Sequence, residues 1–477
     1  MKENTEPDRR NMEKLKALNE KEKKQNKMKL PKWAWSPDGI KVKTKPESLG
    51  SVILKESHYL YIQNKDKYDL YQYETEKGYW QLIGEQAIKY LITSKLKSVN
   101  AWTARTNSDT FKFIKDSIEI KSPLQTINKI YPRYFNFKNG VYDFKTNQLL
   151  PHSPDYYFTS CTDYALNLND DETPETNSWL HYSLGDAKKL VMEYIGYAFY
   201  RSYEPIQGFL ILQGAGGDGK TTFINYVNSL FDHNDVSSVS LTDLAKADNN
   251  FDLSELYLKA LNSYPDISKS IIQDTAQIKA LTGNDLIDAR VKNKPRLHNR
   301  FFAKLLFGAN ALPDFKDTSE GFSRRINLAN WQKINNFNRD FDTNKIKAER
   351  GAFVYHCIQL AKQAMKRGYF SNTDETTELR KNWVKANDHV QEFIEEYCIT
   401  GEDYQEKKTY LYSGYRSFCF DNGYKALSNQ KFKQELANKG YFEKNTYING
   451  VRTRAYAGIR LKPSVDITNN DKVTRLK

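Results

Sequence analysis

The sequence is poor in the residues that build disulfide frameworks and zinc sites. Its 477 residues include only four cysteines, Cys161, Cys357, Cys398 and Cys419. None of them lies in a CxxC pattern or at a spacing from histidine that suits zinc. Disulfide-stabilised secreted folds and zinc modules are therefore not expected.

Long apolar runs are also missing. No stretch approaches the roughly 18 consecutive apolar residues of a membrane span, and the mean hydropathy is −0.75. The amino-terminal region is charged and has no apolar segment typical of a secretion signal. We therefore expect a cytoplasmic protein with no membrane partner.

Positive charge is in excess, with a formal net charge of +13 and a pI near 9.1. Clustered Lys and Arg release counterions from a phosphate backbone, so this charge indicates a polyanionic partner such as DNA. Basic residues concentrate in residues 1–32, 288–304 and 425–462, and the last segment holds nine basic and two acidic residues. Any one of these clusters alone is equally compatible with a solvated surface.

A glycine-rich loop after the apolar residues 209–212 predicts a nucleotide site. The segment Gly214-Ala-Gly-Gly-Asp-Gly-Lys220-Thr221 has P-loop spacing and lies between an expected strand and an expected helix at 222–231. Lys220 is placed to reach the β- and γ-phosphates, and Thr221 to bind Mg²⁺. We expect ATP and Mg²⁺ as cofactors, because a chance glycine-rich turn would not explain the flanking elements. The expected nucleotide-binding residues are Gly214, Gly216, Gly217, Asp218, Gly219, Lys220, Thr221 and Thr222.

Two polar residues near expected strand ends favour hydrolysis of the bound nucleotide as the reaction. Asp266 follows an apolar segment, where a carboxylate holds Mg²⁺ or the attacking water. No second acid adjoins it, and an aspartate that caps the next helix is the alternative. Asn310 follows the expected strand 303–308 and fits a γ-phosphate sensor, with an ordinary turn asparagine as the alternative.

Two adjacent arginines, Arg324 and Arg325, lie shortly after Asn310. An arginine supplied across a subunit boundary stabilises charge in the transition state of phosphoryl transfer, so either residue as such a finger would require a ring-shaped homo-oligomer. An exposed pair without a partner is the alternative. The residues expected to carry catalysis are Lys220, Asp266, Asn310, Arg324 and Arg325, with Thr221 and Asp266 on the metal.

Residues 285–302 predict a β-hairpin with a cationic tip. Lys292 and Lys294 lie in its turn, where they would contact the phosphates of a single DNA strand in a central channel without reading bases. A solvated hairpin edge, whose lysines prevent aggregation, is the alternative.

Changes in pattern divide the chain into expected domains. Residues 1–32 form a basic arm expected to be disordered, and 33–166 form an α+β accessory domain with a hairpin at Asn139-Gly140. Residues 167–202 are expected to be a linker and helical lead-in. Residues 203–385 alternate strands and helices around the P-loop, which predicts an α/β core of three layers with a mainly parallel sheet. A carboxy-terminal module at 386–465 and a tail at 466–477 complete the chain.

The carboxy-terminal module is expected to be a winged helix. Three helical patterns are followed by two strands that meet at Asn449-Gly450, a strong hairpin signal. The third helix would enter a major groove while the hairpin contacts phosphates, although such modules also dock proteins. The expected DNA-binding residues of the module are Lys431, Lys433, Lys444, Arg452 and Arg454.

In their order along the chain, these motifs resemble those of superfamily 3 helicases, an AAA+ branch found in viruses, phages and plasmids. The matching segments are Gly214 to Thr221, Ser263-Tyr-Pro-Asp266-Ile267, Lys279-Ala-Leu-Thr-Gly-Asn-Asp285, Ala289-Arg290, Gly308-Ala-Asn310 and Phe322-Ser-Arg324-Arg325. Asn284 stands where a second glycine is common. The segment from Tyr134 to Asp143 is similar to the region before the helicase in the phage/plasmid and poxvirus primase-helicase group. Within that group, the chain is similar to replication proteins of staphylococcal genomic islands.

The resemblance implies an AAA+ core, a homo-hexamer and ATP-driven translocation on DNA from 3′ to 5′. It also implies the roles given above for Lys220, Thr221, Asp266, Asn310, one of the two arginines and the Lys292 to Lys294 tip. Residues 1–130 contain no DxD pair and no zinc ligands, so primer synthesis is not expected, and a primase or loader protein is a possible partner.

Three functions remain to be distinguished. We expect a replication initiator that unwinds DNA, with its winged helix at a duplex origin and a single strand in its channel. An ATP-switched initiator that assembles on DNA without processive unwinding is the alternative. A small-molecule phosphotransferase is a third class, but it leaves the carboxy-terminal module unexplained.

Overall fold

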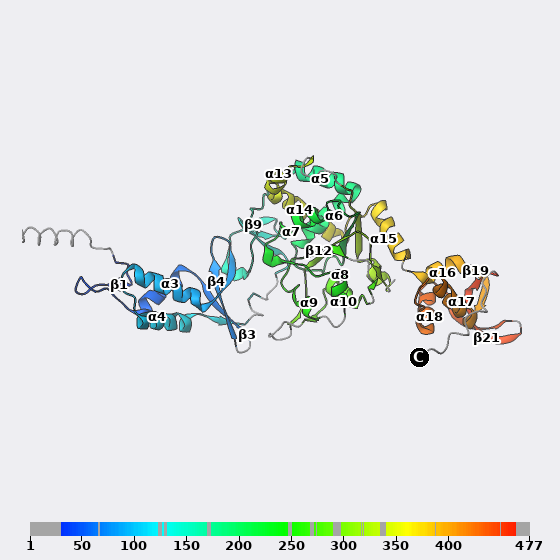
Figure 1. Ribbon diagram of the computed structural model, residues 1–477, viewed down its shortest axis with the longest axis horizontal. Helices are drawn as coiled ribbons and strands as arrows, with labels where there is room; N and C mark the ends of the chain where they lie inside the picture. Colours follow the sequence, from blue (N-terminus) through cyan, green and yellow to red (C-terminus); the bar gives the residue numbers. More distant parts are fainter. Residues whose placement is uncertain are drawn as a thin grey trace, which may run out of the picture. The chain divides into compact units, whose positions relative to one another are not determined.

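The computed structural model describes residues 30–64, 67–122, 126–127, 131–168, 173–246, 250–267, 271–272, 274–289, 297–315, 317, 319–333, 340–386, 388–448 and 450–463 (Figure 1). The chain divides into two compact units. The first contains Met1–Lys129 and His152–Ser160, and the second contains Ile130–Pro151 and Cys161–Lys477. Residues 1–29 of the expected arm and the expected tail lie outside the described residues.

The first unit is a four-stranded sheet with helices on one face, as expected for an α+β fold. Its elements are β1 (Ala34–Trp35), β2 (Lys43–Thr44), α2 (Pro46–Glu56), β3 (Tyr59–Asn64), β4 (Lys67–Glu74), β5 (Tyr79–Ile83), α3 (Glu85–Ser98), α4 (Ala104–Ser117) and β6 (Ile120–Lys121). The strand order is β5-β4-β3-β6. Tyr61 and Leu70 pack on one face against helix residues such as Ile53 and Ile92.

The opposite face of this sheet is covered by the segment 152–160, which we call the strap. Leu60, Ile62, Tyr73 and Trp80 form a small apolar cluster on this face. Within the strap, Tyr157 stacks on Trp80 with ring centroids 6.1 Å apart, and the Trp80 indole N–H donates to the Pro154 carbonyl at 2.9 Å. The strap therefore completes the core of the first unit from a distant part of the sequence.

The second unit contains a five-stranded, fully parallel sheet in the order β11-β12-β16-β10-β18. The strands are β10 (Phe209–Gln213), β11 (Val236–Ser237), β12 (Leu261–Ile267), β16 (Lys304–Ala309) and β18 (Ile326–Asn330). Alternate residues of β10 enter different apolar clusters, Leu210 and Leu212 on one face and Phe209 and Ile211 on the other. The sheet is therefore buried on both faces, which confirms the expected mixed α/β core with a parallel sheet.

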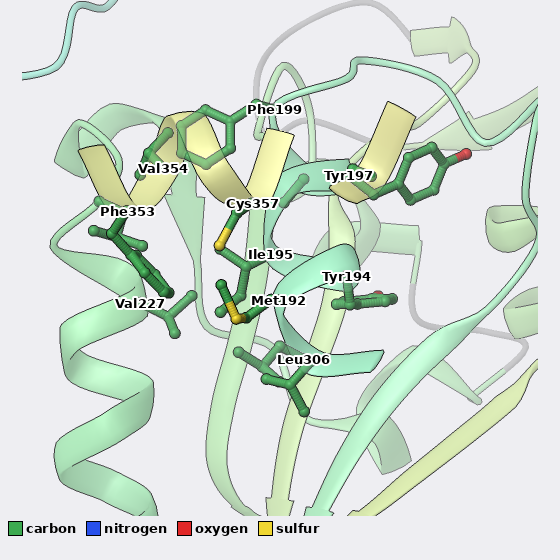
Figure 2. Close-up of a cluster of buried hydrophobic side chains, with 14 of the residues drawn as sticks. Met192, Tyr194, Ile195, Tyr197, Phe199, Val227, Leu306, Phe353, Val354 and Cys357 are labelled. Atoms are coloured by element: carbon green, nitrogen blue, oxygen red, sulfur yellow. The ribbon is translucent and has the colours of Figure 1, made fainter. Parts of the chain in front are cut away.

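Helices surround this sheet. On the face of Leu210 they are α5 (Pro174–Leu184), α6 (Lys188–Ala198), α7 (Lys220–Asn228), α13 (Thr343–Ala348) and α14 (Arg350–Arg367). The other helices of the core are α8 (Leu241–Leu244), α9 (Asn250–Ser254), α10 (Ala276–Thr282), α11 (Glu320–Ser323) and α15 (Asp374–Ala386). Figure 2 shows part of the first cluster, in which Met192 of α6, Val227 of α7, Leu306 of β16 and Cys357 of α14 converge.

Short strands complete the core: β7 (Tyr134–Phe137), β8 (Gly140–Asp143), β9 (Gln148–Leu150), β13 (Ile271–Ile272), β14 (Ile287–Ala289), β15 (Leu297–Asn299) and β17 (Asp314–Phe315). The strands β7 and β8 form the hairpin that the sequence predicts, but they lie in the second unit and not with the accessory domain. Phe135 and Phe137 are buried against Phe199 of the core. Likewise α5, within the expected linker, buries Trp179 against Phe223. Burial of large aromatic rings explains why these segments belong to the core.

The carboxy-terminal part of the second unit has the three helices and the hairpin that the sequence predicts, with one further strand. Its elements are α16 (His389–Tyr397), β19 (Cys398–Lys407), α17 (Lys408–Asp421), α18 (Asn429–Asn438), β20 (Glu443–Ile448) and β21 (Val451–Leu461). The strand order is β19-β21-β20. Ser428 caps α18 by accepting from the Lys431 amide at 3.4 Å. Among the described residues, no helix is long and apolar enough to cross a lipid bilayer.

Candidate nucleotide and nucleic-acid sites

The P-loop connects β10 to α7 at the carboxyl edge of the parallel sheet. Gly217 and Gly219 have φ values of +71° and +96°, a region that glycine enters without steric cost. Residues 215–217 and the side chains of Thr221 and Thr222 are exposed. The loop therefore turns as a phosphate cradle requires, with the amino terminus of α7 behind it.

The Lys220 amine is folded back into the loop. Its Nζ donates to the Gly214 carbonyl at 2.9 Å, the Ala215 carbonyl at 3.0 Å and Asp218 Oδ2 at 2.7 Å. It also contacts Asn310 Oδ1 at 3.1 Å. Lys220 is 4% exposed and Asp218 2% exposed, so the charge of the lysine is compensated inside the loop. A buried amine is stable only with such partners.

Trp331 contacts both the P-loop and the helix that follows it. Its indole N–H donates to the Asp218 carbonyl at 3.1 Å, and its ring stacks on Phe223 of α7 with centroids 4.7 Å apart. Trp331 follows directly after β18 and is 3% exposed. No motif in the sequence signals this role, because the contact joins the ends of two strands that are more than a hundred residues apart.

Asp266 lies in a bulge of β12 near the same edge. The register between β12 and β16 shifts between Tyr264 and Ile267, and a Cβ on Gly308 would lie 2.2 Å from the Pro265 carbonyl oxygen. Only glycine fits there, so Gly308 admits the bulge. The sequence places Asp266 just past the strand, whereas the structure places it inside β12 with an exposed side chain.

Asn310 follows β16, which lies between β10 and β12. Ala309 pairs with Gln213 at the end of β10 and with Ile267 at the end of β12. This register brings Asn310 to the P-loop and explains its contact with Lys220. The edge therefore presents Lys220, Thr221, Asn310 and Asp266, which is a donor set suited to a triphosphate and its cation. The structure describes no cluster of three or more His, Cys, Asp or Glu side chains able to hold a metal ion.

Arg324 and Arg325 lie at the opposite edge of the sheet. They precede β18, whose first residue Ile326 pairs with Phe209 at the start of β10. Because the five residues of β10 span about 16 Å at ~3.3 Å each, these arginines are a full strand length away from the P-loop of their own chain. Arg324 is exposed and contacts Gln207 Oε1 at 3.2 Å.

Arg325 is buried in its own chain. It is 7% exposed, its Nε donates to Thr282 Oγ1 at 3.1 Å, and its guanidinium also donates to the Gly321 carbonyl. Burial, together with the neighbouring Arg324, lowers the pKa of Arg325. Sequence alone does not distinguish the two arginines. In the structure, Arg324 is exposed, whereas Arg325 is bound to partners in its own chain.

Asp317 is a residue that sequence reasoning missed. It accepts from Lys279 Nζ at 2.7 Å, from the Ser319 amide at 3.0 Å and from Thr275 Oγ1. Burial alone would raise the pKa of Asp317, but these hydrogen bonds lower it to about 2. Asp317 therefore ties the segment before α11, and with it Arg324, to the start of α10.

The structure describes the base of the expected basic hairpin, which is formed by β14 and β15. Ile287 pairs with Asn299 and Ala289 with Leu297 in an antiparallel ladder between β14 and β15. Asn284, which precedes this hairpin, has a φ of +63°, a conformation that asparagine tolerates better than most residues. The tip with Lys292 and Lys294 lies outside the described residues.

The five basic residues expected to bind DNA in the carboxy-terminal module are all exposed. Lys433 of α18 and Arg454 of β21 approach the same carboxylate, Glu443, at 2.6 Å and 3.8 Å. For Lys431, Lys444 and Arg452, the part of the module that the structure describes shows no such shared partner. Hydrogen bonds and charge from Lys433 and Lys408 lower the pKa of Glu443.

Three segments of the chain match known protein families. Residues 21–182 match a family described as D5 N terminal like, residues 385–467 match one described as poxvirus D5 protein-like, and residues 212–325 match a family of unknown function, DUF5906. No curated protein sequence matches the chain.

Solved structures were compared as well. The apo structure of the NrS-1 C-terminal region matches with a TM-score of 0.50 and 12% identity, covering 87% of this chain and 99% of that chain. At this identity the similarity concerns the fold alone. A structure of JCV helicase matches with a TM-score of 0.26 and 11% identity, over 44% of this chain and 59% of that chain. This TM-score is too low to indicate a shared fold. The two D5-type family matches support the expected relationship to viral helicases of the superfamily 3 type.

Proposed function

We propose that the chain is an ATP-driven DNA helicase and replication initiator of a mobile genetic element, acting as a homo-hexamer. One observation carries this proposal: Lys220 and Asn310 meet at one edge of the parallel sheet, while the exposed Arg324 lies at the other. The nucleotide cradle of one chain is therefore separated from Arg324 of the same chain by the length of a strand. In a ring, the arginine edge of one subunit would face the cradle of the next, which assigns the finger to Arg324 and leaves Arg325 as a structural residue.

The roles of the residues follow from their positions. When ATP enters, Lys220 would exchange Asp218 and the two loop carbonyls for phosphate oxygens, while the amides of the loop and of α7 bind phosphate. Mg²⁺, held by Thr221 and Asp266, would neutralise charge on the phosphates. Asn310, already in contact with Lys220, is placed to sense whether the γ-phosphate is present.

Hydrolysis would move the hairpin between β14 and β15, whose base adjoins the core and whose Lys292 and Lys294 would hold one DNA strand in the channel. The carboxy-terminal module would act as a winged helix at a duplex origin, with Lys431 and Lys433 on its third helix. We further propose 3′ to 5′ polarity and an interaction with a primase or loader protein.

Strand displacement tests this function. The full chain, with ATP and Mg²⁺, is expected to separate a forked duplex. The double variant Lys292→Ala, Lys294→Ala should keep its DNA-free ATPase rate and lose strand separation, because only the grip on DNA is removed. Lys345→Ala, Lys347→Ala on α13 is the matched control, since it removes the same charge from exposed positions.

Two results would count against the proposal. If the wild-type chain hydrolyses ATP and binds DNA but never separates strands, the ATP-switched initiator is the better function. If the control variant loses unwinding as fully as the hairpin variant, the effect belongs to net charge and not to the hairpin.

A further inference from the structure

The hairpin of β20 and β21 has two chemically different faces. Directly opposite residues of an antiparallel pair place their side chains on the same face. One face, which we call the tyrosine face, is formed by the pairs Glu443–Tyr456, Asn445–Arg454 and Tyr447–Arg452. The other face is formed by the pairs Lys444–Ala455, Thr446–Thr453 and Ile448–Val451. Arg452 and Arg454 thus lie on one face and Lys444 on the other.

The tyrosine face is continuous with the helices of the module. At its base, Tyr456 is 1% exposed and belongs to the apolar cluster that contains Phe432 and Leu436 of α18. Beside it, Glu443 is contacted by Lys433 of α18 at 2.6 Å and by Lys408 of α17 at 3.4 Å. The base of this face therefore packs on the helices, and its cations adjoin those of α18.

Toward the tip, the same face becomes exposed. Strand residues rise by about 3.4 Å each, so Tyr447 lies about 14 Å along β20 from Glu443. Tyr447 is 67% exposed, and Arg452 and Arg454 beside it are exposed as well. Burial does not account for this aromatic ring, in contrast to Tyr415 and Tyr456 of the same module, which are buried.

An exposed aromatic ring on the same face as two guanidinium groups suits one kind of ligand. Aromatic side chains stack on unpaired bases and cations follow the phosphates, a combination that proteins use for single-stranded nucleic acid. Lys408, Lys433 and Arg454 surround Glu443 at the base of the tyrosine face, and Arg452 lies on the same face nearer the tip, so its charge also favours a polyanion. Paired bases inside a duplex do not offer a free face to such a ring.

We propose that the tyrosine face binds single-stranded DNA, with Tyr447 stacked on an unpaired base and Arg452 and Arg454 on the adjacent phosphates. We make this proposal on the premise of the proposed function, in which the module meets DNA. It adds that the module holds a single-stranded segment, and that Lys444 does not take part. Glu443 acts as a positioning residue that keeps Lys433 and Arg454 beside each other.

The experiment measures binding of the full chain to three fluorescent probes: a fork with unpaired arms, a single-stranded oligonucleotide, and a blunt duplex of the same sequence. Tyr447→Ala is expected to weaken binding to the fork and the single strand about tenfold, the scale of one stacked base. Binding to the blunt duplex should change less than about twofold. Tyr447→Phe should restore tight binding, because stacking needs the ring and not the hydroxyl.

Charge variants give a second readout. Arg452→Ala, Arg454→Ala should reduce the magnitude of the slope of log affinity against log salt by about 1.4 on the single strand, as loss of two phosphate contacts predicts. Lys444→Ala, on the other face of the same hairpin, should leave this slope nearly unchanged.

Two outcomes overturn the proposal. One is an equal loss on the blunt duplex and the fork in Tyr447→Ala, which would make the hairpin a duplex contact. The other is unchanged binding to all three probes, which would leave a protein as the occupant. A folded Tyr447→Phe variant with wild-type binding excludes misfolding as the cause of a loss. If the wild-type chain never unwinds DNA but Tyr447→Ala still loses the single strand, the helicase function fails and the tyrosine face stands.

Discussion

Positive charge is used differently in the parallel-sheet core and in the carboxy-terminal module. In the core, Lys220, Lys304 and Arg325 are buried, with exposed fractions of 4%, 0% and 7%. In the module, Arg452 and Arg454 are exposed. A buried cation is committed to partners inside the protein, whereas an exposed one is available to a polyanion.

Lys304 is a fully buried cation whose contacts are all inside the protein. The sequence counts it in the basic cluster 288–304, but its amine is enclosed, donating to the Tyr200 and Phe302 carbonyls at 2.9 Å and 3.0 Å. It also lies over the rings of Tyr197 and Tyr203. Burial lowers the pKa of Lys304 well below its ordinary value. The formal net charge of the chain therefore exceeds the positive charge that would be exposed to DNA.

The largest expected difference between the two regions concerns Lys220. Lys220→Ala should reduce ATP hydrolysis to background, because the γ-phosphate loses its main cation. DNA binding without nucleotide should persist, since the exposed cations of the module are untouched. ATP turnover and fluorescence anisotropy on the same preparation check both expectations. Asp218→Asn, which removes the other half of the buried pair, should keep measurable hydrolysis; a complete loss there would mean that the ion pair serves folding.

The next largest effect should separate the two arginines. Arg324→Ala is expected to lower the rate of ATP hydrolysis about 10³-fold without loss of stability, as removal of an arginine finger does. Arg325→Ala should instead destabilise the core by about 2 kcal/mol, because Thr282 and Gly321 lose a buried partner. Steady-state ATPase assays and thermal unfolding distinguish these outcomes.

Mixed oligomers test whether Arg324 acts across subunits. Arg324→Ala chains supply an intact cradle and Lys220→Ala chains an intact finger, so mixing the two inactive variants should restore part of the activity. No recovery in a mixture shown to co-assemble would contradict the trans arrangement.

The smallest expected effect concerns Asp317, whose pKa is lowered to about 2 from 3.8. A carboxylate with a lowered folded-state pKa stabilises the protein above its unfolded-state pKa and loses that contribution as pH falls. Asp317→Asn should therefore cost about 2 kcal/mol at neutral pH, since one pKa unit corresponds to ~1.4 kcal/mol. The difference from wild type should shrink below about pH 4 and vanish near pH 2.

Urea unfolding followed by tryptophan fluorescence between pH 7 and pH 3 measures this dependence. Asp421→Asn, at an exposed aspartate at the end of α17, is the control and should show no comparable trend. A pH-independent loss in Asp317→Asn would mean that the side chain fills space and that its charge contributes nothing.

Much of the nucleotide site could be predicted because its signals are local. The order of strand, glycine-rich loop and helix around Lys220 is visible in the continuous segment from Phe209 to Asn228, and the structure confirms it. The position of Asn310 after a buried strand is equally local. The pairing of Lys220 with Asp218 and Asn310, in contrast, depends on the strand order, which periodicity does not contain.

The parts of the fold that could not be predicted depend on contacts between distant segments. Arg325 is buried because Thr282 lies beside it, and Trp331 serves the P-loop because β18 is next to β10. Strand β19 was missed because its residues Gly401 to Lys407 are polar and mostly exposed or half-buried, so no alternation of apolar residues marks it. Residues 152–160 were expected in the accessory domain, but no signal in the sequence showed that residues 130–151 and 161–166 belong to the second unit.

Because the strap, residues 152–160, belongs to the first unit, more than one backbone connection joins the two units. The backbone passes from one unit to the other three times, after Lys129, after Pro151 and after Ser160. A single proteolytic nick at any one of these places would leave the halves tethered through the others. A gene fragment that stops at Lys129 would encode a sheet with Trp80 and Leu60 bared to water, so it should aggregate unless the nine missing residues are grafted back.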